Sequence, residues 1–458
     1  MSKNKEQYKR IISFFSSFIL IIALAVTFGY IWYEYYSDAI IFPFYRRGNW
    51  VVIFIYMILT LLFFKAYGSF KIGYFKRTDA LYGQGISMIA VNIITYFQIS
   101  VIGRNFMKLY PIALMTIIDM SFIICWNFIN TRIYARLFPP RRLVIIYGSK
   151  QAANLVDKMC ERDDKYIICE SIGIDAPLEQ LKSEIVKYDG AIICDVGGQK
   201  RNDLIKYCFE QSKRAYIAPK ISDIIIRGAE DIKIFDSPLL LCRNYGLGFE
   251  QKLLKRFFDI VVSLICIVLT SPFMLIISAA VKLYDRGPVL YKQKRLTTGG
   301  REFYVMKFRS MIPDAEKDGV PRLATESDSR VTPVGAFLRK CRLDELPQLF
   351  NILKGDMSVV GPRPERPELT RDYEKEMPEF RFRLKVKAGL TGYAQVTGVY
   401  DTTPYDKLKM DLMYIENYSF ILDIRIILMT IKTMILPGEM NSQRKNREKD
   451  IADKGGKM

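Results

Sequence analysis

The sequence predicts an integral membrane protein with a four-helix transmembrane bundle at its N-terminus and two α/β domains after it. Three observations support this fold class. Half of the 458 residues are hydrophobic and 13% are aromatic, which is high for a soluble protein. Long apolar runs fill the first 140 residues, and short apolar runs then alternate with amphipathic stretches. We expect domains at 1–138, 139–248 and 249–440, followed by a charged flexible tail at 441–458.

The N-terminal bundle is predicted from four runs of nearly uncharged residues, each close to the ~20 residues that a helix needs to cross a bilayer. They are Ile11 to Tyr33, Asn49 to Phe64, Gly83 to Gly103 and Tyr110 to Asn130. A cleaved signal peptide is the alternative for the first run, but that run is too long and three more follow. Cations concentrate before the first run, between the second and third, and after residue 132, so these parts are expected to be cytoplasmic.

The middle domain is predicted to be Rossmann-like, because apolar strands alternate with amphipathic stretches between residues 142 and 242. A dinucleotide site would require the pattern GxGxxG after the first strand, and Gly148 stands there alone. The pair Gly197-Gly198 could cradle a phosphate, although such a pair after a strand is more often a turn. We therefore interpret this domain as a spacer or a regulatory unit. Its ligand cannot be predicted.

A further apolar run, Ile260 to Val281, contains 22 uncharged residues and could be a fifth span. Lysines and arginines flank both of its ends, which is expected when both ends lie on the cytoplasmic face. Ser271 and Pro272 interrupt the run at its middle, where proline removes a backbone donor. Two interpretations remain open from the sequence physics: a re-entrant helix of about residues 256–284 that bends at Ser271-Pro272, or a kinked spanning helix.

Composition also restricts the chemistry. The chain has no histidine, which excludes Ser/His/Asp and Cys/His catalysis. Its eight cysteines are scattered without a CxxC pair, so zinc is not indicated, and a metal would be held by oxygen ligands, as Mg²⁺ or Mn²⁺ is. The net charge of +19 suits an anionic partner such as a phosphorylated substrate, anionic lipid or nucleic acid. No nucleic-acid-binding motif accompanies the basic runs.

The candidate active site is the segment RLDELPQLFNILKGDMSVVGPRP, residues 342–364. A helical apolar stripe of Leu346, Leu349, Phe350 and Leu353, with Pro347 in the first turn and Gly355 as C-cap, places Asp344 and Glu345 at a helix N-terminus. They could simply cap that helix. With Arg363 downstream and a Mg²⁺ ion, a carboxylate could instead attack phosphorus without an imidazole base. Lys307 and Arg309 would share one side of a strand and suit a diphosphate, or form an ordinary solvated face.

Six motifs carry a resemblance to a known family: KRFFD (255–259), Ser271-Pro272, KFRSM (307–311), LDELPQLFNILKGDMSVVGPRP (343–364), GLTGYAQVTG (389–398) and YIENYS (414–419). Residues 250 to 438 resemble the bacterial sugar transferases, the monotopic phosphoglycosyl transferases. The whole chain is similar to the long-form polyprenyl glycosylphosphotransferases of exopolysaccharide, capsule and O-antigen synthesis. The resemblance implies transfer of a sugar-1-phosphate from a UDP-sugar to undecaprenyl phosphate, with UMP released. It also implies a re-entrant helix and a catalytic domain on the cytoplasmic face of the bacterial inner membrane.

The resemblance also implies residue roles. Asp344 would be the nucleophile of a covalent aspartyl phosphosugar, Glu345 would hold Mg²⁺ beside it, and Arg363 would bind nucleotide or phosphate. We also expect Lys307, Arg309, Arg342 and Gln348 to line the substrate site, and Lys255 and Arg256 to meet the polyprenyl phosphate or anchor lipid. Ala388 replaces the usual proline of KPGLTG, and the RLTTGG turn lacks an earlier glycine, which leaves local loop shape open.

The alternatives belong to other classes. Tyr405 and Lys409 form the YxxxK pair of short-chain dehydrogenases, but the missing glycine fingerprint argues against that reading. The second alternative is a catalytically silent membrane scaffold for polysaccharide assembly, which would have the same membrane helices but no transfer activity. Expected partners are membrane lipids and other polysaccharide-assembly proteins. The transferred sugar, the pathway and any homo-oligomeric state cannot be read from the sequence.

Overall fold

The computed structural model describes residues 8–45, 47–70, 77–148, 151–242, 246–312, 328, 330–398 and 402–435. The chain divides into two compact units, Met1–Pro219 and Lys220–Met458. The first unit holds four long apolar helices and a parallel α/β domain, and the second holds a mixed α/β domain with one further long apolar helix. The predicted tail at 441–458 lies outside the described residues.

The four N-terminal helices are α2 (Lys9–Ile31), α3 (Arg47–Ala66), α4 (Arg77–Ile102) and α5 (Tyr110–Leu137), with a short π-helical turn, η1 (Trp32–Tyr36), extending α2. Each is long and apolar enough to cross a membrane. Large side chains such as Phe28, Tyr56 and Met115 are buried between the helices. Apolar side chains also cover the outer faces, for example Val26 and Ile117, and this arrangement suits a hydrocarbon environment.

A buried polar cluster joins these helices. Asp119 of α5 accepts hydrogen bonds at Oδ2 from Asn92 of α4 at 3.2 Å and from the Tyr56 hydroxyl of α3 at 3.4 Å. Asn92 also donates to Thr116 at 2.9 Å. Such interhelical hydrogen bonds fix the rotation of each helix, because an unpaired polar group in an apolar bundle is costly.

The α/β domain of the first unit is a four-stranded parallel sheet in the order β2-β1-β3-β4. Its elements are β1 (Arg141–Tyr147), α6 (Gln151–Cys160), β2 (Tyr166–Gly173), α7 (Leu178–Lys187), β3 (Gly190–Cys194), α8 (Gly198–Glu210) and β4 (Arg214–Ile217). Val144 and Ile146 pack with residues of α7 and α8, while Leu143 and Ile145 pack with residues of α6. The central strands are therefore buried on both faces, which explains their continuous apolar runs.

The second unit begins with α9 (Ile221–Arg227) and the antiparallel pair β5 (Glu230–Ile234) and β6 (Ser237–Leu241), followed by α10 (Phe249–Asp285). The antiparallel strands β7 (Leu290–Leu296) and β8 (Glu302–Phe308) are joined through η2 (Thr298–Gly300), where Gly299 and Gly300 have φ of 69° and 78°. The RLTTGG segment (295–300) thus contains a turn in which both glycines are suited to their backbone conformation, since a positive φ favours glycine.

Most of the remaining elements of the second unit pack around a main hydrophobic core, while α11 (Pro333–Lys340) packs in a second cluster with α10 and β8. The other elements are η3 (Leu343–Glu345), α12 (Gln348–Lys354), β9 (Ser358–Val360), α13 (Pro367–Glu376), η4 (Pro378–Lys385), β10 (Gly389–Thr391), α14 (Tyr393–Thr397), α15 (Pro404–Glu416) and α16 (Phe420–Ile435). Strands β9 and β10 pair in parallel. Buried side chains of α12, β9 and α15, including Ile352, Val360 and Leu408, form the centre of this core.

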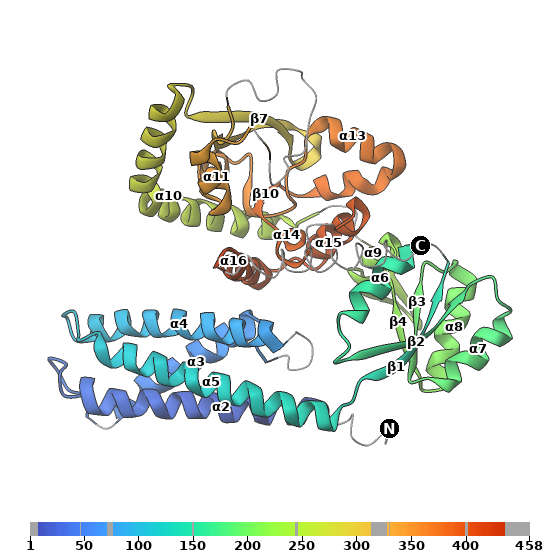
Figure 1. Ribbon diagram of the computed structural model, residues 1–458, viewed down its shortest axis with the longest axis horizontal. Coiled ribbons are helices and arrows are strands. Elements are labelled where there is room, and N and C mark those ends of the chain that lie inside the picture. Colours follow the sequence, from blue (N-terminus) through green and yellow to red (C-terminus); the bar gives the residue numbers. More distant parts are fainter. Residues whose placement is uncertain are drawn as a thin grey trace, which may run out of the picture. The chain divides into compact units, whose positions relative to one another are not determined.

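Helix α10 is a single helix of 37 residues with Pro272 inside it. A straight helix of that length would be about 55 Å long, yet both of its arms contact the same domain. Val262 and Cys266 pack against the main core, and Ile277 and Val281 pack against Phe308 of β8 and Leu338 of α11. Figure 1 accordingly shows α10 as two arms that meet at a bend.

The bend has a local chemical cause. Pro272 cannot donate the backbone hydrogen bond that Val268 would otherwise accept. The Ser271 hydroxyl donates to the Val268 carbonyl at 2.9 Å and partly replaces that bond. The apolar side chains around the bend are exposed, with Val268 at 69% and Leu275 at 71%. A group of exposed apolar side chains therefore surrounds the bend of α10, away from the core.

Candidate active site

The two adjacent carboxylates lie in the short turn η3, between α11 and α12. Arg342 begins this turn in the left-handed region, at φ 54° and ψ 23°, and Leu343 packs against the cluster that contains Ile277 and Val281. The chain reversal leaves the Asp344 side chain only 8% exposed. Asp344 and Glu345 thus precede α12 in a separate turn, whereas the sequence predicted them at the N-terminus of one continuous helix.

The features predicted for helix α12, its C-cap and its apolar stripe, are confirmed in part. Gly355 ends it in the left-handed conformation, at φ 98°, as the C-cap prediction requires. The predicted apolar stripe is wrong at Phe350, whose side chain is 42% exposed. Because α12 contains only seven residues, its buried face centres on Leu349 and Ile352.

Glu345 is held by two cations from other elements. Its Oε1 accepts from Lys307 Nζ of β8 at 2.8 Å and from Arg363 Nη2 at 3.2 Å. Burial alone would raise the pKa of Glu345, but Arg363 and Lys307 outweigh burial and lower it to about 2. Glu345 is therefore a permanent anion near neutral pH, and it fixes the two cations beside Asp344.

Asp344 has the opposite environment. Burial raises its pKa above the usual range, and the neighbouring charge of Glu345 raises it further, while Lys307 and Arg339 oppose this shift. Such a poorly solvated carboxylate, close to fixed positive charges, is typical of a nucleophile or an acid-base group. The adjacent carboxylates thus differ in role because their surroundings differ.

Arg309 lies away from this pair of carboxylates. It follows β8 directly, is 7% exposed and forms an ion pair with Asp285 at the end of α10. Gly287 leaves room for it, because a Cβ at that position would lie 2.2 Å from Arg309 Nη1. Lys307 and Arg309 therefore bind different carboxylates, although their spacing suggested one shared diphosphate.

Lys255 and Arg256 also have structural partners. Lys255 is buried and forms an ion pair of 2.6 Å with Asp423 of α16, which also accepts from the Tyr414 hydroxyl at 2.8 Å. Arg256 donates to the carbonyls of Ile352 and Leu353, each at 2.7 Å, at the C-terminal end of α12. Since α12 is about 10 Å long, Arg256 lies at the end of that helix farthest from Asp344.

The remaining predicted residues lie at the entrance to α12. Gln348 is its first residue and is 4% exposed, while Arg342 is exposed and acts electrostatically on Glu345. Sequence reasoning missed Arg339, which donates from Nε to the Ser310 hydroxyl at 2.8 Å and acts on Asp344. It also missed Asp285 and Asp423, because nothing local in the sequence predicts their distant partners.

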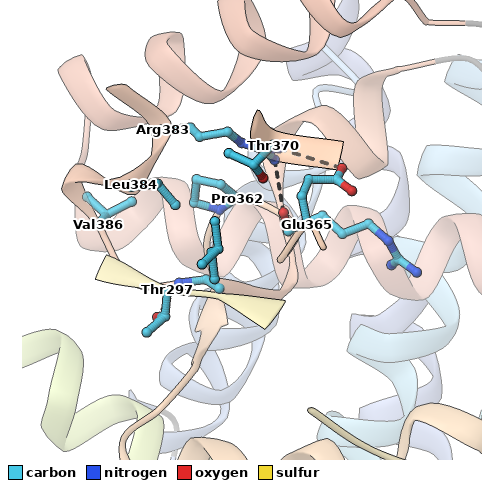
Figure 2. Close-up of a pocket in the computed structure, with 10 residues that line it drawn as sticks. Thr297, Pro362, Glu365, Thr370, Arg383, Leu384 and Val386 are labelled. Atoms are coloured by element: carbon cyan, nitrogen blue, oxygen red, sulfur yellow. Dashed lines mark hydrogen bonds and ion pairs between the residues drawn. The ribbon is translucent and has the colours of Figure 1, made fainter. Parts of the chain in front are cut away.

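A pocket lies beside this site and includes Arg363 in its lining. Figure 2 shows its walls, where Arg383 and Glu365 point toward each other and Pro362 and Thr297 also line the pocket. Arg383 is only 4% exposed, although it carries a charge. The buried charges of this wall are thus directly connected to the segment that carries Arg363.

Asp344 and Glu345 are the two adjacent carboxylates that the sequence predicts as metal ligands. Within the described part of the chain, no group of three or more His, Cys, Asp or Glu side chains could hold a metal. Mg²⁺ is commonly bound by only one or two carboxylates, with substrate phosphates and waters as its other ligands. Asp344 and Glu345 fit such a partial ligand set.

Comparison with known proteins gives a match in the second unit. Residues 250–437 match the family model described as bacterial sugar transferase. Over 185 residues the chain is 43% identical to the UDP-N-acetylgalactosamine-undecaprenyl-phosphate N-acetylgalactosaminephosphotransferase of Aeromonas hydrophila, covering 40% of this chain and 44% of the relative. Over 221 residues it is 38% identical to the UDP-glucose:undecaprenyl-phosphate glucose-1-phosphate transferase of Xanthomonas campestris pv. campestris, covering 47% and 46%.

In both cases the match spans less than half of the relative's length. A third relative is matched over nearly its whole length. The exopolysaccharide production protein PSS of Rhizobium leguminosarum bv. phaseoli is 38% identical over 195 residues, which are 41% of this chain and 97% of the relative. The matched residues contain Asp344, Glu345 and the two cations that contact Glu345, Lys307 and Arg363. The chain belongs to the bacterial sugar transferase family.

Proposed function

We propose that this protein transfers a sugar-1-phosphate from a UDP-sugar to undecaprenyl phosphate, the initiating step of bacterial surface polysaccharide synthesis. The observation that carries the proposal is the buried Asp344 beside Glu345, with Lys307 and Arg363 held against that second carboxylate. The names of the relatives support the choice of donor and acceptor, since they specify UDP-sugars and undecaprenyl phosphate.

The proposed reaction has two steps. In the first, an Asp344 oxygen attacks the phosphorus that carries the sugar, the bond from that phosphorus to the bridging oxygen breaks, and UMP leaves. In the second, an undecaprenyl phosphate oxygen attacks the same phosphorus, which releases Asp344 and gives undecaprenyl-diphospho-sugar. An ionised carboxylate needs no general base for this attack, which is consistent with a chain that has no histidine.

The cations supply charge stabilisation in both steps. Lys307 and Arg363 are fixed by Glu345 before any substrate binds, so they need no reorganisation when negative charge develops on the phosphoryl oxygens. We propose that Asp344 and Glu345 would hold Mg²⁺ here, and that the ion would supply positive charge against the donor diphosphate. Positioning of the donor and preset charge then account for most of the expected catalysis.

The membrane arrangement is part of the proposal. We propose that α2, α3, α4 and α5 span the bacterial inner membrane and that α10 is re-entrant, with the catalytic domain on the cytoplasmic face. Two features support this: both arms of α10 pack on one domain, and exposed apolar residues surround its bend. A domain fixed at the membrane surface can meet the phosphate of a long apolar acceptor that stays in the bilayer.

The proposal also includes a role for the parallel α/β domain. We propose that residues 139–248 act as a Rossmann-like spacer or regulatory unit and that the protein works with membrane lipids and other polysaccharide-assembly proteins. The buried middle of β1 and the fully buried β3 support a stable domain of its own.

The proposal is tested by UMP release. Purified protein is supplied with Mg²⁺, undecaprenyl phosphate and one UDP-sugar at a time, beside an Asp344→Asn variant and an Asp372→Asn control on the exposed face of α13. We expect release with at least one donor, its loss in Asp344→Asn, and normal release in the control. Release that survives in Asp344→Asn would exclude the nucleophile, and no release with any UDP-sugar would favour a silent scaffold.

A further inference from the structure

The segment that carries Arg363 is fixed through its backbone. Four consecutive carbonyls, those of residues 362 to 365, each accept a hydrogen bond from a distant part of the chain. The donors are Gly389 N to Pro362 O at 2.9 Å, Arg383 Nη2 to Arg363 O at 2.9 Å, Arg295 Nη1 to Pro364 O at 3.1 Å, and Leu296 N to Glu365 O at 3.1 Å. This segment is therefore anchored before any ligand binds.

Arg383 is the most deeply buried charged donor of that set. Its side chain is 4% exposed, and its guanidinium lies 4.9 Å from the centre of the Phe380 ring. Asp411 at 2.8 Å and Glu365 at 3.6 Å balance its charge as ion pairs, while its hydrogen bond goes to the Arg363 carbonyl. Figure 2 shows Arg383 and Glu365 in this arrangement.

Burying a guanidinium is expensive, so the surroundings must compensate for its lost hydration. Asp411 is itself 2% exposed, and burial raises its pKa to about 6 although Arg383 opposes the shift. The carboxylates of Asp411 and Glu365 thus neutralise the buried guanidinium of Arg383. The hydrogen bond of that guanidinium goes to the main-chain carbonyl oxygen of Arg363. Such an arrangement defines the position of that oxygen closely.

The Arg363 side chain depends on this anchor. It is 47% exposed, whereas Glu345 and Lys307 beside it are 14% and 22% exposed. Packing therefore restricts Arg363 less than it restricts the other two charges. Its contact with Glu345 at 3.2 Å then requires that its backbone be held in place.

We propose that Arg383 is a positioning residue for the transfer reaction: through the carbonyl of Arg363 it holds the Arg363 guanidinium beside Glu345, where it meets the donor diphosphate. This inference rests on the proposed function. Arg383 acts only through Arg363 and touches no substrate. A displacement of about 1 Å in such a group can cost about 100-fold in rate.

The test is a double-mutant cycle. Release of UMP is measured in wild type, Arg383→Gln, Arg363→Gln and the double variant, with Arg381→Gln as control because Arg381 is an exposed neighbour in η4. When Arg363 is present, we expect Arg383→Gln to lower kcat/KM about 10- to 100-fold. When Arg363 is already replaced by Gln, the same change should lower kcat/KM less than about 3-fold. Arg381→Gln should leave kcat/KM unchanged.

A structural role for Arg383 predicts a different result, because its loss would then cost the same factor in both backgrounds. That equality would overturn the inference while leaving the proposed function intact. Arg383→Lys keeps the charge between Asp411 and Glu365, and the same cycle is run with it if Arg383→Gln does not fold. Additive effects of the lysine variant would contradict the inference equally.

A second measurement separates this inference from the proposed function. Affinity for UDP is determined by titration calorimetry for the same variants, and the same non-additivity is expected. If wild type binds UDP but releases no UMP, the proposed reaction fails and the binding cycle still decides the role of Arg383. If wild type neither binds UDP nor releases UMP, both the proposed function and this inference are wrong.

Discussion

Adjacent acidic residues can differ sharply in chemistry when different groups face them. Glu345 is paired with Lys307 and Arg363, and its pKa falls to about 2, so it stays ionised throughout the physiological range. Asp344, one residue earlier, is more deeply buried, and its pKa is raised. The first organises positive charge, and the second is left as the reactive oxygen.

Removing the Lys307 charge should shift the pH dependence of turnover. Lys307 is the strongest influence that lowers the pKa of Asp344, so Lys307→Gln raises that pKa. Since only the ionised carboxylate attacks, the acid limb of kcat against pH should move to higher pH. The maximal kcat should also fall by about 100-fold, because a preset cation is lost.

The control for this pH profile is Lys292→Gln, which removes an exposed cation from the neighbouring strand β7. Its acid limb should coincide with that of wild type. An unchanged acid limb in Lys307→Gln would show that the titrating group is not Asp344.

At the scale of elements, α12 is short and depends on its neighbours. Arg256 of α10 accounts for two hydrogen bonds to its last carbonyls, which otherwise lack partners within the helix. Arg256→Gln should lower the free energy of unfolding by about 1–3 kcal/mol. Thermal unfolding in detergent measures this change beside Lys252→Gln, an exposed cation in the first turns of α10.

This variant also separates two roles for Arg256. If Arg256 mainly binds the acceptor phosphate, Arg256→Gln should raise the KM for undecaprenyl phosphate and leave the melting temperature equal to that of Lys252→Gln. The structure predicts a lower melting temperature instead, because the two carbonyls lose a charged donor.

The bend of α10 is testable by topology. Single cysteines at Leu253 and Leu283, both exposed, are placed in a chain without other cysteines and labelled with a membrane-impermeant maleimide in oriented vesicles. A bent helix predicts that both positions react from the same side. In Pro272→Ala the missing backbone donor is restored, so a fraction of molecules should show the two positions on opposite sides.

Labelling of the two positions from opposite sides in the chain that keeps Pro272 would contradict the re-entrant arrangement. A cysteine at Phe209, an exposed position of α8, serves as a reference for the α/β domain of the first unit.

Much of the element pattern could be predicted from sequence because local rules determine it. Apolar runs gave the long helices, strand-helix alternation gave the parallel sheet, and glycine gave the turn at Gly299 and the end of α12 at Gly355. Local rules also explain the failures. A helical stripe could not predict that Asp344 would occupy a separate turn, because that turn depends on Leu343 packing against α10.

The site was predicted in part for the same reason. Asp344, Glu345 and Arg363 share one motif, but the contacts that give them their properties are long-range. Lys255 pairs with Asp423 across 168 positions, and Ser358 pairs with Asp259 across 99. Single-sequence patterns contain no signal for such pairs, so the predicted roles of Lys255 and Arg309 did not include their carboxylate partners.

At the scale of the whole molecule, the described residues include five long apolar helices, and the full chain has a net charge of +19. Positive charge favours an anionic donor and an anionic membrane surface, and apolar helices favour retention in the bilayer. The two properties together suit a reaction between a charged nucleotide and a lipid phosphate. The family match, residues 250–437, lies within the second compact unit and does not extend to the first.

The central claim is that Asp344 becomes covalently bonded to phosphorus. The most direct measurement is mass spectrometry of the protein after brief incubation with Mg²⁺ and its UDP-sugar in the absence of undecaprenyl phosphate. The account predicts an added sugar-phosphate mass on the peptide that contains Asp344, lost on addition of undecaprenyl phosphate and never formed in Asp344→Asn. Turnover through a ternary complex, with UMP released only when the acceptor is present and no adduct on that peptide, would contradict it.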